Sequence, residues 1–109
     1  MDLTEYQAEV VRTDATCNEV YTVGLAMAVI GLCGELGEIA EPVKKHLYHK
    51  HELRREHLAK ELGDMLWYLT LLCDKLDISL QDVLDANVKK LRERYPHGFD
   101  SDRSINRVE

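Results

Sequence analysis

The chain has 109 residues, of which 45% are hydrophobic and 31% charged, and its formal net charge is −6. This composition is typical of one folded domain and excludes a disordered chain. The acidic balance repels a phosphate backbone, so we expect no nucleic-acid polymer as a partner, and a ligand that carries phosphates would need a bridging cation.

The cysteines and the uncharged segments indicate the cellular compartment. Cys17, Cys33 and Cys73 form no CxxC pair and are odd in number, which predicts reduced thiols. No basic region leads into an apolar stretch and a cleavage site, so we expect no signal peptide. The longest uncharged run, Val20 to Gly34, contains small and polar residues and is expected to fall short of a membrane span. We therefore expect a cytoplasmic protein with no membrane partner.

Apolar residues recur at helical spacing along the whole chain, and no segment alternates for long with the period of a strand. The first helix is expected from Leu3 to about Thr16, with Asp2 or Thr4 as its cap. The pattern thus predicts an all-α chain from its first element onward.

The second helix is expected from near Asn18 to about Tyr48, and it contains Pro42. Proline has no backbone donor, so we expect it to kink or interrupt the helix near residues 38–42. The polar stretch from His46 to Glu52 is the expected connection to the next helix.

The third helix is expected from about Leu53 to Leu76, and it is apolar on most of its sides after Asp64. A helix of this kind lies in the middle of a bundle or faces a second subunit. A fourth helix is expected to begin at an N-cap, Ser79, and to end near Arg94, before a Tyr-Pro-His-Gly stop.

Four helices in one domain predict a four-helix bundle. We expect this domain to cover residues 1–99, and we expect the tail at residues 100–109 to be mobile because it has no apolar period. The apolar breadth of the third helix predicts a homodimer or a homotetramer built as a dimer of dimers.

Two similar strings carry paired acids, Glu35-Leu-Gly-Glu38 and Glu61-Leu-Gly-Asp64. Carboxylates three residues apart lie on neighbouring turns of one helix face and repel each other. Both pairs border uncharged segments, so partial burial adds to the cost. Solvated helix faces are the alternative, but two matching pairs favour a bound divalent cation, Mg²⁺ or Mn²⁺. Glycines inside both strings, Gly37 and Gly63, suggest a close approach of helices.

These strings resemble the MazG-like nucleoside triphosphate pyrophosphohydrolases, an all-α superfamily that includes dimeric dUTPases. The hallmark of that superfamily is ExxE, a spacer and ExxD, and here 22 residues separate the two motifs. The resemblance covers nearly the whole chain and extends to further strings: Gly31-Leu-Cys-Gly34, Met65-Leu-Trp-Tyr68, Asn87-x-x-Lys90-Leu-x-x-Arg94-Tyr95-Pro96 and Gly98-Phe99.

The resemblance implies roles for particular residues. The metal ligands that it implies are Glu35, Glu38, Glu61 and Asp64. The substrate-binding residues that it implies are Asn87, Lys90, Arg94 and Tyr95. Pro42 departs from the uninterrupted helix that we expect after the first motif, which puts the placement of Lys44 and Lys45 in doubt as phosphate contacts.

The reaction expected is hydrolysis of a nucleoside triphosphate between its α- and β-phosphates, giving a monophosphate and pyrophosphate. The metal polarises the phosphorus and neutralises the leaving group. Glu35 or Glu38 is the candidate that activates water, and Lys90 is the candidate that stabilises the leaving group. Base and sugar preference depend on pocket shape, which the sequence does not specify.

The sequence admits four other interpretations. His46 and His49 fit a solvated connection better than a transition-metal site, because no supporting ligand is spaced beside them. A di-iron bundle uses Glu-x-x-His, and no histidine here has glutamate three residues before it. A non-catalytic helical module that binds a partner stays open. Trp67 and Tyr68 either stack on a base or belong to the core or a dimer interface, and their apolar stripe favours the core for at least one of them.

Overall fold

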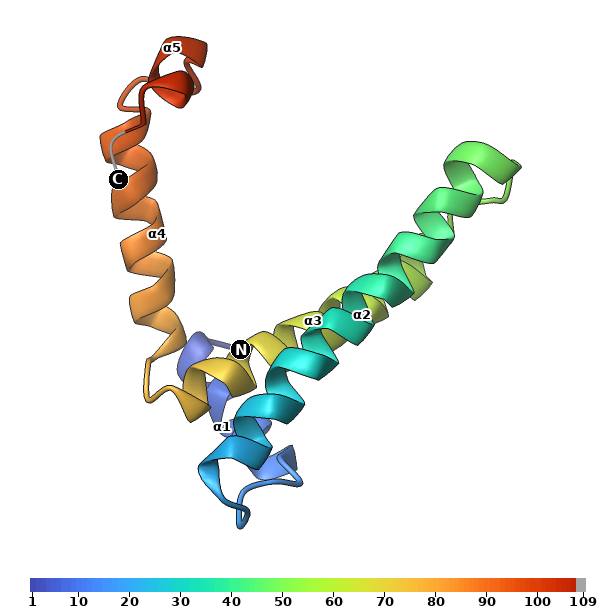
Figure 1. Ribbon diagram of the computed structural model, residues 1–109, viewed down its shortest axis with the longest axis vertical. Helices are drawn as coiled ribbons and strands as arrows, with labels where there is room; N and C mark the ends of the chain where they lie inside the picture. The colour runs from blue at the N-terminus through green and yellow to red at the C-terminus, as the bar shows by residue number, and fades with distance from the viewer. Residues whose placement is uncertain (108–109) are drawn as a thin grey trace. The chain divides into compact units, whose positions relative to one another are not determined.

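The computed structural model describes residues 1–107, and regular structure in that range is helical throughout. The helices are α1 (Leu3–Thr13), α2 (Tyr21–His49), α3 (Arg55–Lys75), α4 (Leu80–Arg94) and α5 (Ser101–Ile105) (Figure 1). The prediction of an all-α chain is confirmed. The chain divides into two compact units, Met1–Asp77 and Ile78–Glu109, and each is described by itself.

Helix α1 begins with a capping box. The side chain of Asp2 accepts a hydrogen bond from the Glu5 amide at 2.8 Å, and Glu5 Oε2 accepts one from the Asp2 amide at 3.3 Å. Of the two caps expected, Asp2 is therefore confirmed. The helix ends at Thr13, before the expected Thr16, because the Asp14 side chain accepts hydrogen bonds from Thr16 and holds the chain in a turn.

Helix α2 runs through Pro42, so the expectation that proline interrupts it is wrong. One missing backbone donor costs a single hydrogen bond, and α2 packs along α3 (Figure 1), which offsets that cost. Lys44 and Lys45 therefore keep helical register, and their amino groups lie 3.1 and 3.8 Å from the Glu41 carboxylate. The helix begins at Tyr21, three residues after the expected start, and it ends where Lys50 adopts a left-handed conformation.

The core lies where α1 joins the antiparallel pair of α2 and α3. Val10, Ala28 and Leu71 are fully buried there, one from each of the three helices. Partly buried side chains pack against this cluster: Tyr6, Met27, Trp67 and Leu72. Helix α3 is two residues shorter at its start and one shorter at its end than the predicted Leu53–Leu76. The core accounts for Trp67, Leu71 and Leu72 in the apolar second half of α3.

Many apolar side chains on α2 and α3 remain exposed in the single chain, among them Val29, Ile30, Leu36, Leu62 and Leu66. By length and composition alone, α2 is long and apolar enough to cross a membrane, since an 18-residue window within it has a mean hydropathy of 1.7. The expectation that this segment falls short of a membrane span therefore needs correction. Core helices of soluble proteins meet the same criterion. A second copy that covers these faces stays a prediction.

The second unit contains α4 and α5. Ser79 caps α4 as expected, since its Oγ accepts a hydrogen bond from the Asp82 amide at 3.0 Å. In the tail, the side chain of Arg103 donates to the Arg94 and Glu93 carbonyls at 2.7 and 3.2 Å and so holds α5 at the end of α4. Val108 and Glu109, the end of the tail expected to be mobile, lie outside the described residues. That α4 completes a four-helix bundle with the first unit stays a prediction.

Candidate metal centre

Helices α2 and α3 bring together three of the four carboxylates expected to bind metal. One oxygen each from Glu35, Glu61 and Asp64 lies within 4.8 Å of the others. Glu61 and Asp64 share a face of α3 because three residues separate them, and Glu35 faces them from α2. Glu35, which precedes the other two residues by 26 or more positions in the sequence, thus joins them in one acidic group. We call it the carboxylate group.

Glu38 lies one turn after Glu35 and outside the carboxylate group. Its side chain is exposed and lines a neighbouring pocket. Its charge nevertheless contributes to the raised pKa of Glu35. The role of Glu38 as a metal ligand stays a prediction.

Glu35 is the electrostatically costly member of the carboxylate group. Its Oε2 atom is buried and has no hydrogen-bond partner among the described residues. A hydrogen bond with the Glu61 side chain, burial and the charges of Glu61, Asp64 and Glu38 raise the pKa of Glu35 from 4.5 to about 7. A buried carboxylate oxygen without a donor is an available ligand, and with the carboxylates of Glu61 and Asp64 it matches the all-oxygen coordination of Mg²⁺. The residues therefore fit a divalent cation.

An aromatic cavity of about 360 Å³ adjoins the carboxylate group and is lined by Met27, Glu35, Asp64, Trp67 and Tyr68. The Trp67 and Tyr68 rings stand edge to face, with centroids 5.1 Å apart. Both rings therefore line a cavity that also contains two of the metal-ligand candidates, Glu35 and Asp64. For Trp67 the expected core role also holds, because it packs against the buried cluster.

Contacts with α1 and α2 fix the two aromatic side chains. Trp67 Nε1 donates a hydrogen bond to Thr13 Oγ1 at 2.9 Å, which ties α3 to α1. The Tyr68 ring lies so close to Gly31 that a Cβ atom there would overlap it. The expected close approach of helices thus occurs at Gly31. Gly34, Gly37 and Gly63 have no neighbouring atom within 4 Å of the position of a Cβ, so the expectation for Gly37 and Gly63 is not met within one chain.

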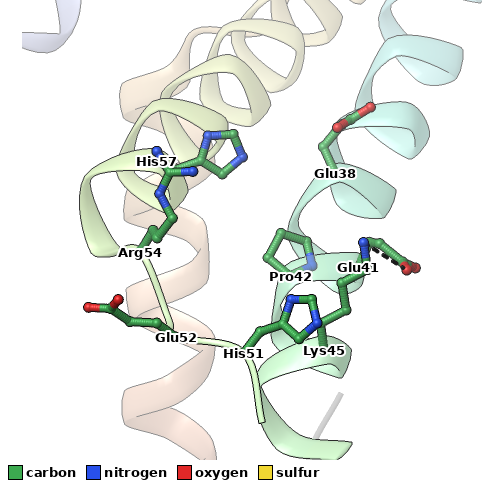
Figure 2. Close-up of a pocket in the computed structure, with 8 residues that line it drawn as sticks. All are labelled: Glu38, Glu41, Pro42, Lys45, His51, Glu52, Arg54 and His57. Atoms are coloured by element: carbon green, nitrogen blue, oxygen red, sulfur yellow. Dashed lines mark ion pairs between the residues drawn. The ribbon is translucent and has the colours of Figure 1, made fainter. Parts of the chain in front are cut away.

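A second pocket, of about 270 Å³, lies between the end of α2 and the beginning of α3 (Figure 2). Its lining is mostly charged: Glu38, Glu41, Pro42, Lys45, His51, Glu52, Arg54 and His57. His57 Nε2 lies 3.6 Å from Glu61 Oε1, so this pocket adjoins the carboxylate group. We call it the basic pocket, for the four basic side chains in its lining. Sequence analysis missed Arg54 and His57 as site residues, although His57 stands one helical turn before Glu61.

The four predicted substrate-binding residues lie in the second unit. Asn87 and Lys90 are exposed on α4 and three residues apart. Arg94 is buried at the end of α4, with its guanidinium carbon 5.9 Å from the centre of the Tyr95 ring. Their roles at the carboxylate group stay predictions, because the two units are described separately.

Comparison with known proteins identifies the family. Residues 26–99, well over half of the chain, match the MazG nucleotide pyrophosphohydrolase domain. The chain belongs to the MazG family. The match spans both acid pairs and α4, and the resemblance seen in the sequence is confirmed. The family points to pyrophosphohydrolase activity, and MazG enzymes generally depend on a divalent metal.

Similar proteins come from a phage and a bacterium. The chain is 40% identical over 88 residues to "Gene 37 protein" of Mycobacterium phage L5, covering 77% of each chain. It is 36% identical over 93 residues to "Uncharacterized protein YpjD" of Bacillus subtilis (strain 168), covering 83% of each. It is 32% identical over 75 residues to "Uncharacterized protein YvdC" of the same organism, covering 61% of this chain and 71% of the relative. No solved structure matched the chain.

Proposed function

We propose that this MazG protein hydrolyses nucleoside triphosphates between the α- and β-phosphates, with Mg²⁺ as its cofactor and Mn²⁺ as a substitute. The observation that carries the proposal is the carboxylate group, in which Glu35 Oε2 is buried without a donor. A triphosphate and an acidic protein repel each other, so metal bound by these carboxylates explains both the acidic group and the binding of an anionic substrate.

Glu35, Glu61 and Asp64 would hold the metal in this proposal. When bound, Mg²⁺ polarises the phosphorus and neutralises negative charge on the leaving pyrophosphate. Glu38 is our preferred residue for orienting the attacking water and accepting its proton, because its carboxylate lies beside the group of three and is not part of it. Glu35 is the second candidate for that step. Lys90 would place a positive charge on the leaving group.

The aromatic cavity supports a nucleoside site next to the metal. The Trp67 and Tyr68 rings offer apolar faces and edges to a base, and Glu35 and Asp64 border the same cavity. A base held there would place its phosphates at the carboxylate group. We propose that Asn87, Arg94 and Tyr95 complete substrate binding, as the sequence predicts.

The test is release of pyrophosphate and monophosphate from a panel of common and modified nucleoside triphosphates, with Mg²⁺ and with EDTA. Glu38→Ala and Asp64→Ala should abolish turnover while helical content stays unchanged. Glu56→Ala is the control, because Glu56 is exposed on α3 and outside the carboxylate group. Retained activity in both active-site variants, or release of a diphosphate and phosphate, would contradict the proposal.

A non-catalytic module that binds a helical partner is the second candidate, and the exposed apolar faces of α2 and α3 favour it. A protein that neither turns over any triphosphate nor binds Mg²⁺ would support it.

The same faces support our proposal of a homodimer or homotetramer, which light scattering tests. The di-iron alternative is disfavoured because the carboxylate group contains no histidine. A cytoplasmic protein without nucleic-acid or membrane partners stays our proposal.

A further inference from the structure

The basic pocket extends from the carboxylate group toward the connection between α2 and α3. Two of its residues connect it to that group: His57 lies 3.6 Å from Glu61 through its Nε2 atom, and Glu38 follows Glu35 by one turn. Arg54 lies about 10 Å before Glu61 along the axis of α3, at 1.5 Å per residue. A ligand anchored at the carboxylates therefore has room to continue toward Arg54.

The acidic and basic side chains of the basic pocket differ in direction (Figure 2). The His57 ring points from α3 toward the gap between the helices, and Arg54, the residue before α3, extends toward that ring, whereas the Glu52 carboxylate points away from the gap (Figure 2). Glu41 is turned toward Lys45, with their charged atoms 3.8 Å apart (Figure 2). The pocket therefore presents positive charge and hydrogen-bond donors to a ligand, although three of its lining residues are glutamates.

Arg54 is the basic residue with unused binding capacity. Its guanidinium makes no hydrogen bond or ion pair with any residue in the described range 1–107, whereas Lys45 pairs with Glu41. A planar guanidinium offers paired donors that match the oxygens of a phosphate group, and it stays charged at any physiological pH. An unpaired arginine on the wall of a pocket next to a metal site favours an anion as occupant.

The two pockets lie on opposite sides of the carboxylate group along α3. Trp67 and Tyr68 follow Asp64 by three and four residues, and His57 and Arg54 precede Glu61 by four and seven. One side is aromatic and the other is charged without an aromatic ring apart from the histidines. This polarity gives a bound nucleotide a direction, with the base toward Trp67 and the phosphate end toward Arg54.

We infer that the basic pocket binds the β- and γ-phosphates of the substrate, and the pyrophosphate after cleavage, through Arg54 with His57 as a second donor. This inference rests on the proposed function. It assigns Arg54 to the leaving group, on the first unit of the chain, independently of the residues on α4.

The test is calorimetric binding of inorganic pyrophosphate, a nucleoside monophosphate and a triphosphate analogue with an α,β-methylene bridge, each with Mg²⁺. Arg54→Ala should weaken pyrophosphate and the analogue by about tenfold or more and leave the monophosphate unchanged. Arg54→Lys should recover part of the loss. Arg55→Ala is the matched control, because it removes the same charge from the next residue, which does not line the pocket.

The outcomes separate this inference from the proposed function. Equal losses in Arg54→Ala and Arg55→Ala, an equal loss for monophosphate and triphosphate, or no pyrophosphate binding by the wild type would overturn the assignment of Arg54. A wild-type protein that binds pyrophosphate through Arg54 but hydrolyses no triphosphate would instead refute the proposed function. A wild type that hydrolyses triphosphates while Arg54→Ala keeps full pyrophosphate affinity would refute the inference alone.

Discussion

Asp14 and Glu35 are carboxylates with buried oxygens in the same unit, and their surroundings have opposite effects. Asp14 Oδ1 accepts hydrogen bonds from the Thr16 amide at 2.8 Å and the Thr16 hydroxyl at 2.6 Å, and Asp14 Oδ2 accepts one from Lys75 Nζ at 2.7 Å. Burial by itself raises the pKa of Asp14, but the hydrogen bonds from Lys75 and Thr16 and the charge of Lys75 outweigh it and lower the pKa. For Glu35 a hydrogen bond with Glu61, burial and the negative charges of Glu61, Asp64 and Glu38 all act in the same direction, and its pKa rises to about 7.

The difference shows that burial alone does not explain the raised pKa of Glu35. Asp14 has a structural role, and the chain places Lys75 and Thr16 beside it. Gly24 leaves room for the lysine, since a Cβ atom there would lie 2.5 Å from Lys75 Cε. At Glu35 no residue within 1–107 donates a hydrogen bond to Oε2. The contrast supports an external cation as the missing partner of Glu35.

The largest loss of stability is expected when Asp14 loses its ion-pair partner, Lys75. Lys75→Met leaves Asp14 buried with the amide and hydroxyl donors of Thr16 but without a counter-charge. The variant should lower the free energy of unfolding by about 3 kcal/mol. Chemical denaturation measures this loss. Metal affinity at the carboxylate group should not change in the folded protein. A loss below the error of the measurement would mean that Asp14 does not depend on Lys75.

A smaller effect is expected from the contact that sets the spacing of α2 and α3 beside the carboxylate group. Gly31→Ala forces a methyl group into the Tyr68 ring and should cost about 2 kcal/mol. Gly34→Ala is the matched control and should stabilise the helix by up to about 1 kcal/mol, because nothing lies within 4 Å of its added methyl group. Thermal unfolding of both variants checks the pair. Destabilisation by Gly34→Ala would instead indicate a second copy packed against that position.

The smallest effect is the pH dependence of stability, to which Glu35 and Asp14 contribute with opposite signs. Since the pKa of Glu35 is about 7 in the folded chain against 4.5 ordinarily, the metal-free protein should lose stability as pH rises from about 4.5 to about 7, by roughly 1 kcal/mol. Asp14 has a lowered pKa, so its contribution is lost only as pH falls below 3.8.

Unfolding midpoints across this pH range, with EDTA and with Mg²⁺, measure the effect. Mg²⁺ should remove the loss at neutral pH, and Glu35→Gln should remove it without metal. A loss at neutral pH that persists in Glu35→Gln would show that another group causes it.

The sequence predicted the first four helices well because their signals are local, but it missed α5, whose cap is Asp100. The Asp2 and Ser79 caps and the helical spacing of apolar residues each depend on neighbours within one or two turns. The failure at Pro42 has the same origin, because the local cost of proline was visible and the packing of α2 along α3 was not. The first helix ends earlier than expected where residues distant in the sequence bind its end: Trp67 donates a hydrogen bond to Thr13, and Lys75 donates one to Asp14.

The sequence predicted which residues form the carboxylate group, but not how their side chains are arranged in space. The repeated acid pairs identified Glu35, Glu61 and Asp64, yet the spacing that Glu35 and Glu38 share with the second pair did not indicate that Glu38 would lie outside the group. Arg54 was missed because an arginine before a helix is ordinary in a sequence. Its significance comes from the pocket formed across the interhelical gap.

The only tryptophan of the chain, Trp67, lines the aromatic cavity, and its indole N–H donates a hydrogen bond to Thr13. Its emission therefore arises from a single place, between the buried cluster and the cavity. Any molecule that enters the cavity, and any loosening of α1 from α3, changes the surroundings of that one fluorophore. The protein thus carries its own optical reporter of occupancy, and titrations need no attached dye.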